Sequence, residues 1–153
     1  MIWATDGSAG AERALPFAKR LAASPDAKLV AVHVRELLVG RAGGYPVRAD
    51  EDELVNELGQ RVESLRADGF DASLRLATSN DANAAHVLAD VALEMGGDVI
   101  VVGTRGHGAV AGLLLGSVAQ RLLHVAHCPV LAVPPLVPAP ALAVDSKPVS
   151  VKS

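Results

Sequence analysis

Glycine spacing before a serine makes one stretch of this sequence suited to anion binding. Gly103 and Gly106 follow the apolar run 99–102, and Gly116 and Ser117 come after nine further residues. Glycines let backbone N–H groups approach an anion closely. A helix beginning near Ser117 would add unpaired N–H donors and a partial positive charge. These residues therefore predict a phosphate-binding loop.

The loop differs from the two common nucleotide-binding fingerprints. No Gly-Lys-Ser/Thr triplet closes it, which excludes a Walker A loop, and its third glycine lies too far along for a dinucleotide motif. Turns in a long surface loop would also collect glycines, but a loop of this length without secondary structure is uncommon unless it is functional. Ser117 is also suited to a simple N-cap role, which is compatible with phosphate binding.

Five strand-like segments are expected to position this loop. They lie at 2–5, 28–34, 72–77, 99–102 and 130–133, with helical spacing between each pair. The run before Gly103 is apolar throughout, which is typical of a strand buried on both faces. The alternation predicts an α/β fold: a single doubly wound five-stranded parallel sheet with helices on both faces.

Local signals refine the bounds of these elements. Ser8 is expected to cap the first helix. Several glycines and a proline within Glu36–Ala49 predict a mobile loop. Asn80 or Asp81 is expected to cap the third helix, and Met95 is expected to face the core from that helix.

Composition and charge limit the class of protein. With 153 residues, half of them hydrophobic, the chain is long enough for one domain with its own core. A net charge of −3, with both signs interspersed, gives no electrostatic case for nucleic acid or anionic membranes. The single cysteine excludes an intramolecular disulfide and fits a reducing compartment. No signal peptide or membrane-length apolar run is visible, so we expect a cytoplasmic protein.

The composition changes toward the C-terminal end. Five of the nine prolines lie from Pro134 onward, and no helical spacing is present there. This change predicts a folded nucleotide-binding domain over residues 1–135 and a proline-rich disordered tail over 136–153.

The glycine motif and its flanks resemble the ATP-binding signature of the universal stress protein family. The spacing Gly103-x2-Gly106-x9-Gly116-Ser117 matches, and so do Val-Val-Gly-Thr-Arg-Gly around its start and His-Cys-Pro-Val-Leu-Ala-Val beyond its end. The resemblance covers residues 2 to about 133. It implies the strand order 3-2-1-4-5, in which the ends of the first and fourth strands lie side by side at the switch point of the sheet.

The resemblance also implies how ATP would be held. The carboxylate of Asp6 would lie near the adenosine, and the Val34 backbone would meet the adenine edge. Backbone amides of the loop and of the following helical turn would hold the phosphates, at Gly103, Gly106, Gly116, Ser117 and Val118. A Mg²⁺ ion held mainly by the nucleotide's phosphates suits such a site, because Mg²⁺ commonly takes few protein ligands. By residue type alone, Asp6 is equally well a turn residue and Val34 is core packing.

The function implied by the resemblance is that of an ATP-binding stress-response or regulatory protein acting on an unknown partner. A slow ATPase or phosphotransfer enzyme is a second class, but the loop lacks a lysine and no general base is evident, so no catalytic residue is assigned. A non-nucleotide interaction module is a third class, against which the complete glycine motif argues. The five histidines show no metal-ligand spacing, and no metal ligand is assigned.

The resemblance further implies a homodimer. The fifth strand, Val130–Val133, ends the sheet in the implied order and would leave an apolar edge that proteins normally cover. In the family, this strand pairs antiparallel with its copy across a two-fold axis. Pro129 and Pro134 have no N–H group to donate and would limit the pairing to a short segment.

Overall fold

A computed structural model describes residues 1–40, 43–46, 48–80, 83–106 and 115–135. Its elements in chain order are β1 (Ile2–Ala4), α1 (Ala9–Leu21), β2 (Lys28–Gly40), β3 (Gly43–Pro46), α2 (Glu51–Ala67), β4 (Asp71–Ser79), α3 (Ala84–Glu94), β5 (Ile100–Gly103), α4 (Ser117–Val125) and β6 (Val130–Val133). The expected tail at 136–153, Asp81 and the middle of the glycine loop at 107–114 lie outside the described residues.

Five parallel strands form the centre of the fold, in the order β4-β2-β1-β5-β6. Numbered among the parallel strands alone, this is the expected order 3-2-1-4-5, so that prediction is confirmed. The middle strand is β1: Ile2 pairs with Val30 of β2 on one side and with Ile100 of β5 on the other. The carboxyl ends of β1, β2 and β5 therefore point to the same end of the sheet.

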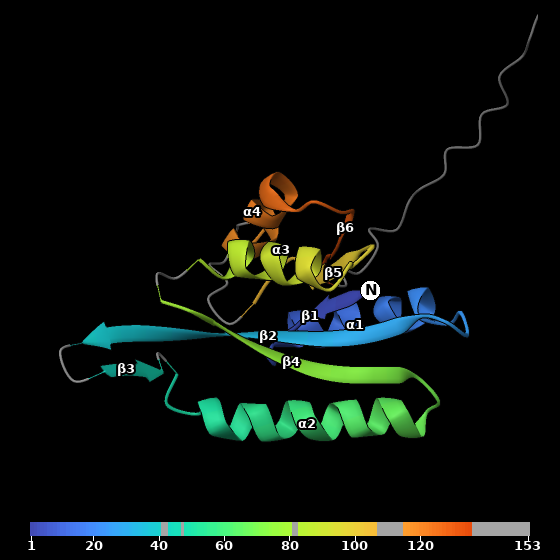
Figure 1. Cartoon of the computed structure of the whole chain (residues 1–153), viewed down its shortest axis with the longest axis horizontal. Coiled ribbons are helices and arrows are strands. Elements are labelled where there is room, and N and C mark those ends of the chain that lie inside the picture. Colours follow the sequence, from blue (N-terminus) through green and yellow to red (C-terminus); the bar gives the residue numbers. More distant parts are fainter. Residues whose placement is uncertain (41–42, 47, 81–82, 107–114, 136–153) are drawn as a thin grey trace, which may run out of the picture.

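Helices cover both faces of the sheet (Figure 1). Because successive strand residues point to opposite faces, Ile2 and Ile100 face α3 and α4, whereas Trp3 and Val101 face α1 and α2. Aromatic residues make up only 3% of the chain, and Trp3 is the largest fully buried side chain. Its Nε1 donates to the carbonyl of Ala11 at 3.0 Å, which joins β1 to the first turn of α1.

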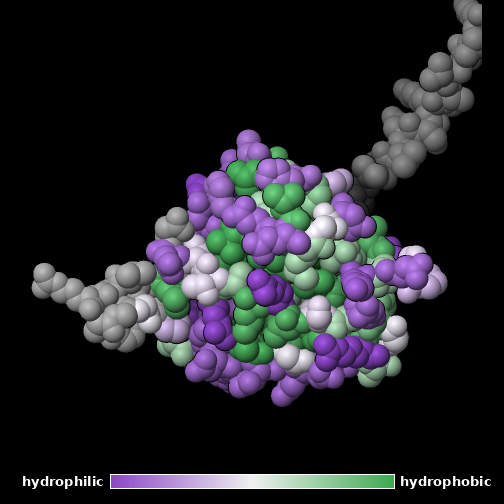
Figure 2. All heavy atoms as spheres, viewed as in Figure 1, coloured by the Kyte–Doolittle hydropathy of each residue, from purple (hydrophilic) through white to green (hydrophobic). Residues whose placement is uncertain are grey.

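The outer parallel strand on the β2 side is β4, as the sequence predicts. It pairs with β2 over nine residues, from Lys28↔Asp71 to Glu36↔Ser79. Figure 2, in the same view as Figure 1, shows hydrophilic side chains along the outer surface of α2 and hydrophobic ones between α2 and α3, where β4 lies. The half-buried leucines Leu74 and Leu76 belong to this strand.

A β-hairpin replaces the loop expected over Glu36–Ala49, so that prediction is wrong. β2 continues to Gly40 and pairs antiparallel with β3, from Leu37↔Pro46 to Gly40↔Gly43. The strand β2 extends beyond the point where β1 ends. Gly40, Gly43 and Gly44 are paired residues of the hairpin between β2 and β3. Pro46 fits because β2 is the one strand that pairs with β3 among the described residues, and edge strands tolerate a missing N–H donor.

The caps of the helices agree with the sequence in part. Ser8 caps α1 as expected, and its Oγ accepts the N–H of Ala11 at 3.2 Å. The cap of α3 is Asn83, which lies beyond both expected residues, Asn80 and Asp81. Met95 is 46% exposed, contrary to expectation, because α3 ends at Glu94 and Met95 lies at the C-cap. Among the described helices, none combines the length and apolar character needed to cross a membrane.

Candidate functional site

A cavity of about 560 Å³ lies beyond the ends of β1 and β5, beside the middle of β2 and at the start of α4. We call it the switch-point cavity. The sheet extends from β1 through β2 to β4 on one side and through β5 to β6 on the other, and open α/β sheets bind ligands where the strand order reverses in this way. All seven residues singled out by the sequence line it: Asp6, Val34, Gly103, Gly106, Gly116, Ser117 and Val118. The structure thus brings these residues together from four separate segments. Their role in binding stays a prediction.

The turn after β1 presents Asp6 to the cavity. Gly7 has φ +73, a conformation that favours glycine, and turns the chain away from the sheet. The Asp6 carboxylate accepts the N–H of Ser8 through Oδ1 at 3.0 Å. Asp6 therefore acts as a turn residue that is hydrogen-bonded to the start of α1. It also lines the cavity.

Two glycines of the loop lie against other parts of the site so closely that a side chain would clash. A Cβ added at Gly103 would lie 2.5 Å from the carbonyl carbon and oxygen of Gly10. A Cβ added at Gly106 would lie 2.5 Å from Oδ2 of Asp6. Glycine at these positions therefore lets β5 and the loop approach α1 and the carboxylate, which is the close approach that the motif predicts.

Gly10 completes this contact and was missed by sequence reasoning. A Cβ added there would lie 1.8 Å from the backbone oxygen of Arg105. Gly10 is buried in the first turn of α1. An isolated glycine inside a helix usually has a packing reason, and this was the available signal.

The start of α4 differs in detail from the expectation. Gly116 is the N-cap and Ser117 the first helical residue, so the hydroxyl of Ser117 does not cap the helix. The Gly116 N–H already donates to the carbonyl of Thr104 at 2.6 Å. Because the first N–H groups of a helix have no intrahelical partner, the amides of Ser117 and Val118 are the donors that α4 offers to an anion.

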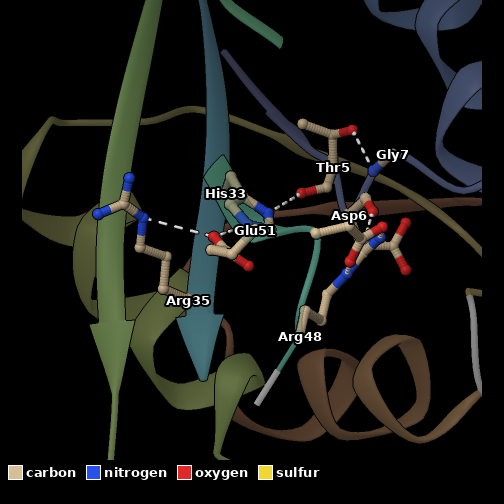
Figure 3. Close-up of polar contacts among 8 residues, drawn as sticks. Thr5, Asp6, Gly7, His33, Arg35, Arg48 and Glu51 are labelled. Atoms are coloured by element: carbon tan, nitrogen blue, oxygen red, sulfur yellow. Dashed lines mark hydrogen bonds and ion pairs between the residues drawn. The ribbon is translucent and has the colours of Figure 1, made fainter. Parts of the chain in front are cut away.

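A buried polar cluster closes the cavity on the side of α2 (Figure 3). His33 of β2 and Glu51 of α2 are 2% and 4% exposed, and the His33 Nε2 lies 2.9 Å from the Glu51 Oε1. The Nε of Arg35 lies 3.4 Å from the same carboxylate oxygen. The other ring nitrogen of His33, Nδ1, contacts the Thr5 carbonyl at 2.9 Å. Sequence reasoning considered His33 only as a metal ligand and missed this cluster.

Arg48 connects the start of α2 to the turn after β1. Its Nη1 donates to the backbone oxygen of Asp6 at 2.8 Å, and its Nε and Nη2 donate to the Asp50 carboxylate at 3.0 and 2.8 Å. The hydrogen bonds to Asp50 raise the pKa of Arg48 from its ordinary value, outweighing the opposite effect of partial burial. Arg48 therefore stays charged beside the cavity but is largely engaged by Asp50.

Two further polar side chains line the cavity or lie beside it. Arg105 lines the cavity, and its buried Nε has no hydrogen-bond partner among the described residues; the same is true of the buried Thr104 hydroxyl. Within the described part of the chain, no group of three or more His, Cys, Asp or Glu side chains is placed to hold a metal ion. The described lining thus includes backbone donors, Arg105 and the Thr104 hydroxyl, besides Arg48, which Asp50 engages.

Comparison with known proteins gives the family. A model of the universal stress protein family matches residues 1–134. The chain belongs to this family. A universal stress protein of Thermus aquaticus is 34% identical over 138 residues, which cover 87% of this chain and 96% of the relative.

Solved structures of universal stress proteins share the fold. A family member from Burkholderia pseudomallei is 33% identical with a TM-score of 0.63, and the match covers 88% of this chain and 94% of that one. A universal stress protein solved in complex with cAMP is 26% identical with a TM-score of 0.60, and covers 86% of this chain and 94% of that one. The family resemblance is confirmed, and the ATP-binding subgroup stays a prediction.

Proposed function

We propose that this universal stress protein binds ATP in the switch-point cavity and thereby regulates a partner. The observation that carries the proposal is the convergence of all seven motif residues on one cavity of about 560 Å³. Cavities that bind small molecules commonly have volumes of about 300–1,000 Å³. The complex of a similar universal stress protein with cAMP supports a nucleotide as the ligand.

The polarity of the cavity suggests the direction of the nucleotide. Phosphates would lie at the start of α4, where the amides of Ser117 and Val118 and the partial positive charge of the helix favour an anion. The adenosine would then lie toward Asp6 and Val34, which line the same cavity. A Mg²⁺ ion would be bound chiefly by the phosphates, because Mg²⁺ commonly keeps several waters and takes few protein ligands.

The proposed role is binding, with little or no turnover. Phosphoryl transfer needs neutralisation of the phosphates and an oriented nucleophile. The carboxylate of Glu51 is committed to His33, and that of Asp6 accepts the N–H of Ser8. Both carboxylates thus already make a structural hydrogen bond, and the proposal assigns neither of them a role in activating water.

Calorimetric titration of the wild-type protein with ATP tests this function, together with a phosphate-release assay on the same sample. We expect saturable binding and turnover far below the ~10 s⁻¹ that is typical of enzymes. Absence of binding would leave the cavity without its proposed ligand, and turnover near that rate would make the protein an enzyme.

We also propose a homodimer formed through β6. Within the part of the chain that the structure describes, this strand pairs with β5 alone and ends the parallel sheet. At its centre, Leu131 is 37% exposed. A second copy pairing antiparallel would cover this edge in an isologous arrangement.

Light scattering at micromolar concentration should give a mass of twice the 15.7 kDa of the chain. Leu131→Glu should shift the protein toward monomer, because two copies would bring like charges together at the interface. Leu93→Glu is the matched control, since Leu93 is 62% exposed on α3 and far along the chain from β6. A wild-type protein that is purely monomeric would exclude this dimer.

A further inference from the structure

A second cavity, of about 380 Å³, lies between α1 and α2, and we call it the interhelix groove. On the side of α1 it is lined by Gly7, in the turn before that helix, and by Glu12 in its first turn. On the other side it is lined by residues of α2 between Leu54 and Ser64. The groove and the switch-point cavity share one turn, because Asp6 lines the cavity and the next residue, Gly7, lines the groove.

The base of the groove is apolar. Leu54 and Leu58 line it and are only 4% and 3% exposed. These two leucines are four residues apart on α2, so they lie on the same face of the helix. A Cβ added at Gly7 would lie 2.3 Å from Cδ1 of Leu54, which places this leucine directly against the turn.

The rim of the groove is polar and carries an excess of negative charge. Glu57, Gln60 and Ser64 line it from α2, and all three are exposed. The Glu12 carboxylate already pairs with Arg61, whose Nη2 lies 2.7 Å from Oε2. Among the described residues, no hydrogen bond or ion pair engages the Glu57 carboxylate. The groove therefore offers one available carboxylate beside an apolar base.

This combination fits the side chain of arginine. Its methylene stem packs on apolar surface while its charged end stays at a polar rim. The guanidinium has five N–H donors, and the carboxylate, amide and hydroxyl of the rim all have oxygen acceptors. Glu57 and Ser64 are two helical turns apart, about 10 Å along the axis, so the acceptors extend over the length of one such side chain.

We propose that the interhelix groove is a docking site for an arginine side chain of a partner protein. Its stem would lie on Leu54 and Leu58, and its guanidinium would bind Glu57. The exposed rim makes the groove accessible to a side chain on another protein, and its negative charge complements the guanidinium. A partner docked here contacts the turn that also borders the switch-point cavity. The proposal rests on the proposed function only for the regulatory role of that partner, since docking itself needs no nucleotide.

Two capped tripeptides, Ala-Arg-Ala and its citrulline counterpart, test the site when backbone amide shifts are recorded without nucleotide. Citrulline has nearly the shape of arginine but no charge. The arginine peptide should give saturable shifts that are largest at Gly7, Leu58 and Gln60. The citrulline peptide should bind about three- to fivefold more weakly, which is the range expected for an exposed ion pair.

Variants of α2 separate this site from a general attraction of cations to an acidic protein. Glu57→Gln should bind the arginine peptide about threefold more weakly and should leave the two peptides nearly equal in affinity. Gln60→Lys should weaken binding further, because the new ammonium can pair with Glu57 three residues away and repels a guanidinium. Asp90→Asn is the matched control, since it removes an exposed carboxylate from α3 on the opposite face of the sheet. It should keep the wild-type affinity.

Three results would overturn the assignment. They are equal binding of the two peptides to wild type, an equal loss of affinity in Glu57→Gln and Asp90→Asn, and the absence of saturable shifts at the groove. Because no nucleotide is present, each of these results leaves the proposed ATP site standing. A protein that binds the arginine peptide as expected but does not bind ATP would instead contradict the proposed function.

Discussion

Gly116→Asp should abolish measurable ATP binding while leaving the protein folded. Gly116 is the N-cap of α4 with φ −71 and ψ 158, an ordinary extended conformation that an aspartate adopts without strain. Aspartate is a favoured N-cap residue, and its carboxylate would accept the N–H of the second or third helical residue. Those residues are Val118 and Ala119, so the new carboxylate would occupy donors proposed for the phosphates.

The expected loss is large because two effects add. The phosphates would lose charge-assisted hydrogen bonds worth roughly 1.5–3 kcal/mol each, and they would face a like charge, so affinity should fall by at least about a hundredfold. A Cβ at Gly116 would lie 3.0 Å from the Thr104 carbonyl oxygen, so a small local shift accompanies any side chain there.

Gly116→Asn is the matched control for that shift, since it has the same shape and caps the helix without a charge. It should weaken binding less than Gly116→Asp, and Ser117→Ala should weaken it least, because the backbone amide of Ser117 remains. Calorimetry measures the affinities and circular dichroism checks the fold. A folded Gly116→Asp protein with wild-type affinity would show that the phosphates lie elsewhere.

Gly103→Ala should destabilise the protein by more than a typical surface substitution. The added methyl group would meet the carbonyl group of Gly10 at 2.5 Å and the nitrogen of Ala11 at 3.0 Å, and all of these atoms are backbone. No side chain can rotate to relieve the contact, so α1 and β5 must separate. Overpacking of this kind costs about 1–3 kcal/mol, which corresponds to a fall in melting temperature of roughly 2–12 °C for a chain of this size.

Gly59→Ala is the matched control for Gly103→Ala. Gly59 lies within α2, and a Cβ added there meets no heavy atom within 4 Å. Alanine favours a helix interior over glycine by about 0.5–1 kcal/mol, so this variant should be more stable than wild type. Thermal denaturation of both variants decides the matter: equal melting temperatures would mean that the close contact between β5 and α1 is absent in solution.

The sequence predicts most helices and strands of this protein, because the hydrophobic pattern and the cap residues that indicate them lie within short stretches of the chain. The run 99–102 is apolar throughout and contributes three of the four residues of β5 (Ile100–Gly103) in the interior of the sheet, and Ser8 caps α1 as its residue type indicates. The hairpin of β2 and β3 was missed because Gly40, Gly43 and Gly44 normally signal a loop. The paired residues lie close together in the sequence, from Leu37↔Pro46 to Gly40↔Gly43, but their residue types do not distinguish a glycine-rich ladder from a glycine-rich loop.

The site is predictable only where a motif marks it. The glycines of the loop stand out by spacing, whereas Gly10 approaches Arg105 across about a hundred positions of sequence and carries no comparable mark. The acidic run 50–53 indicates the start of a helix, and α2 does begin there. It does not indicate that Glu51 turns inward to His33, because that contact depends on how α2 lies across β2.

Mapping the backbone amides by nuclear magnetic resonance during an ATP titration tests the central claim most directly. We expect the nucleotide to lie in the switch-point cavity, between the turn after β1, the middle of β2 and the start of α4. We expect saturable shifts that are largest at Asp6, Val34, Gly106, Ser117 and Val118, with α2 beyond its first turn unaffected. Saturable binding with the largest shifts on α2 or β6, and none at these five residues, would contradict it.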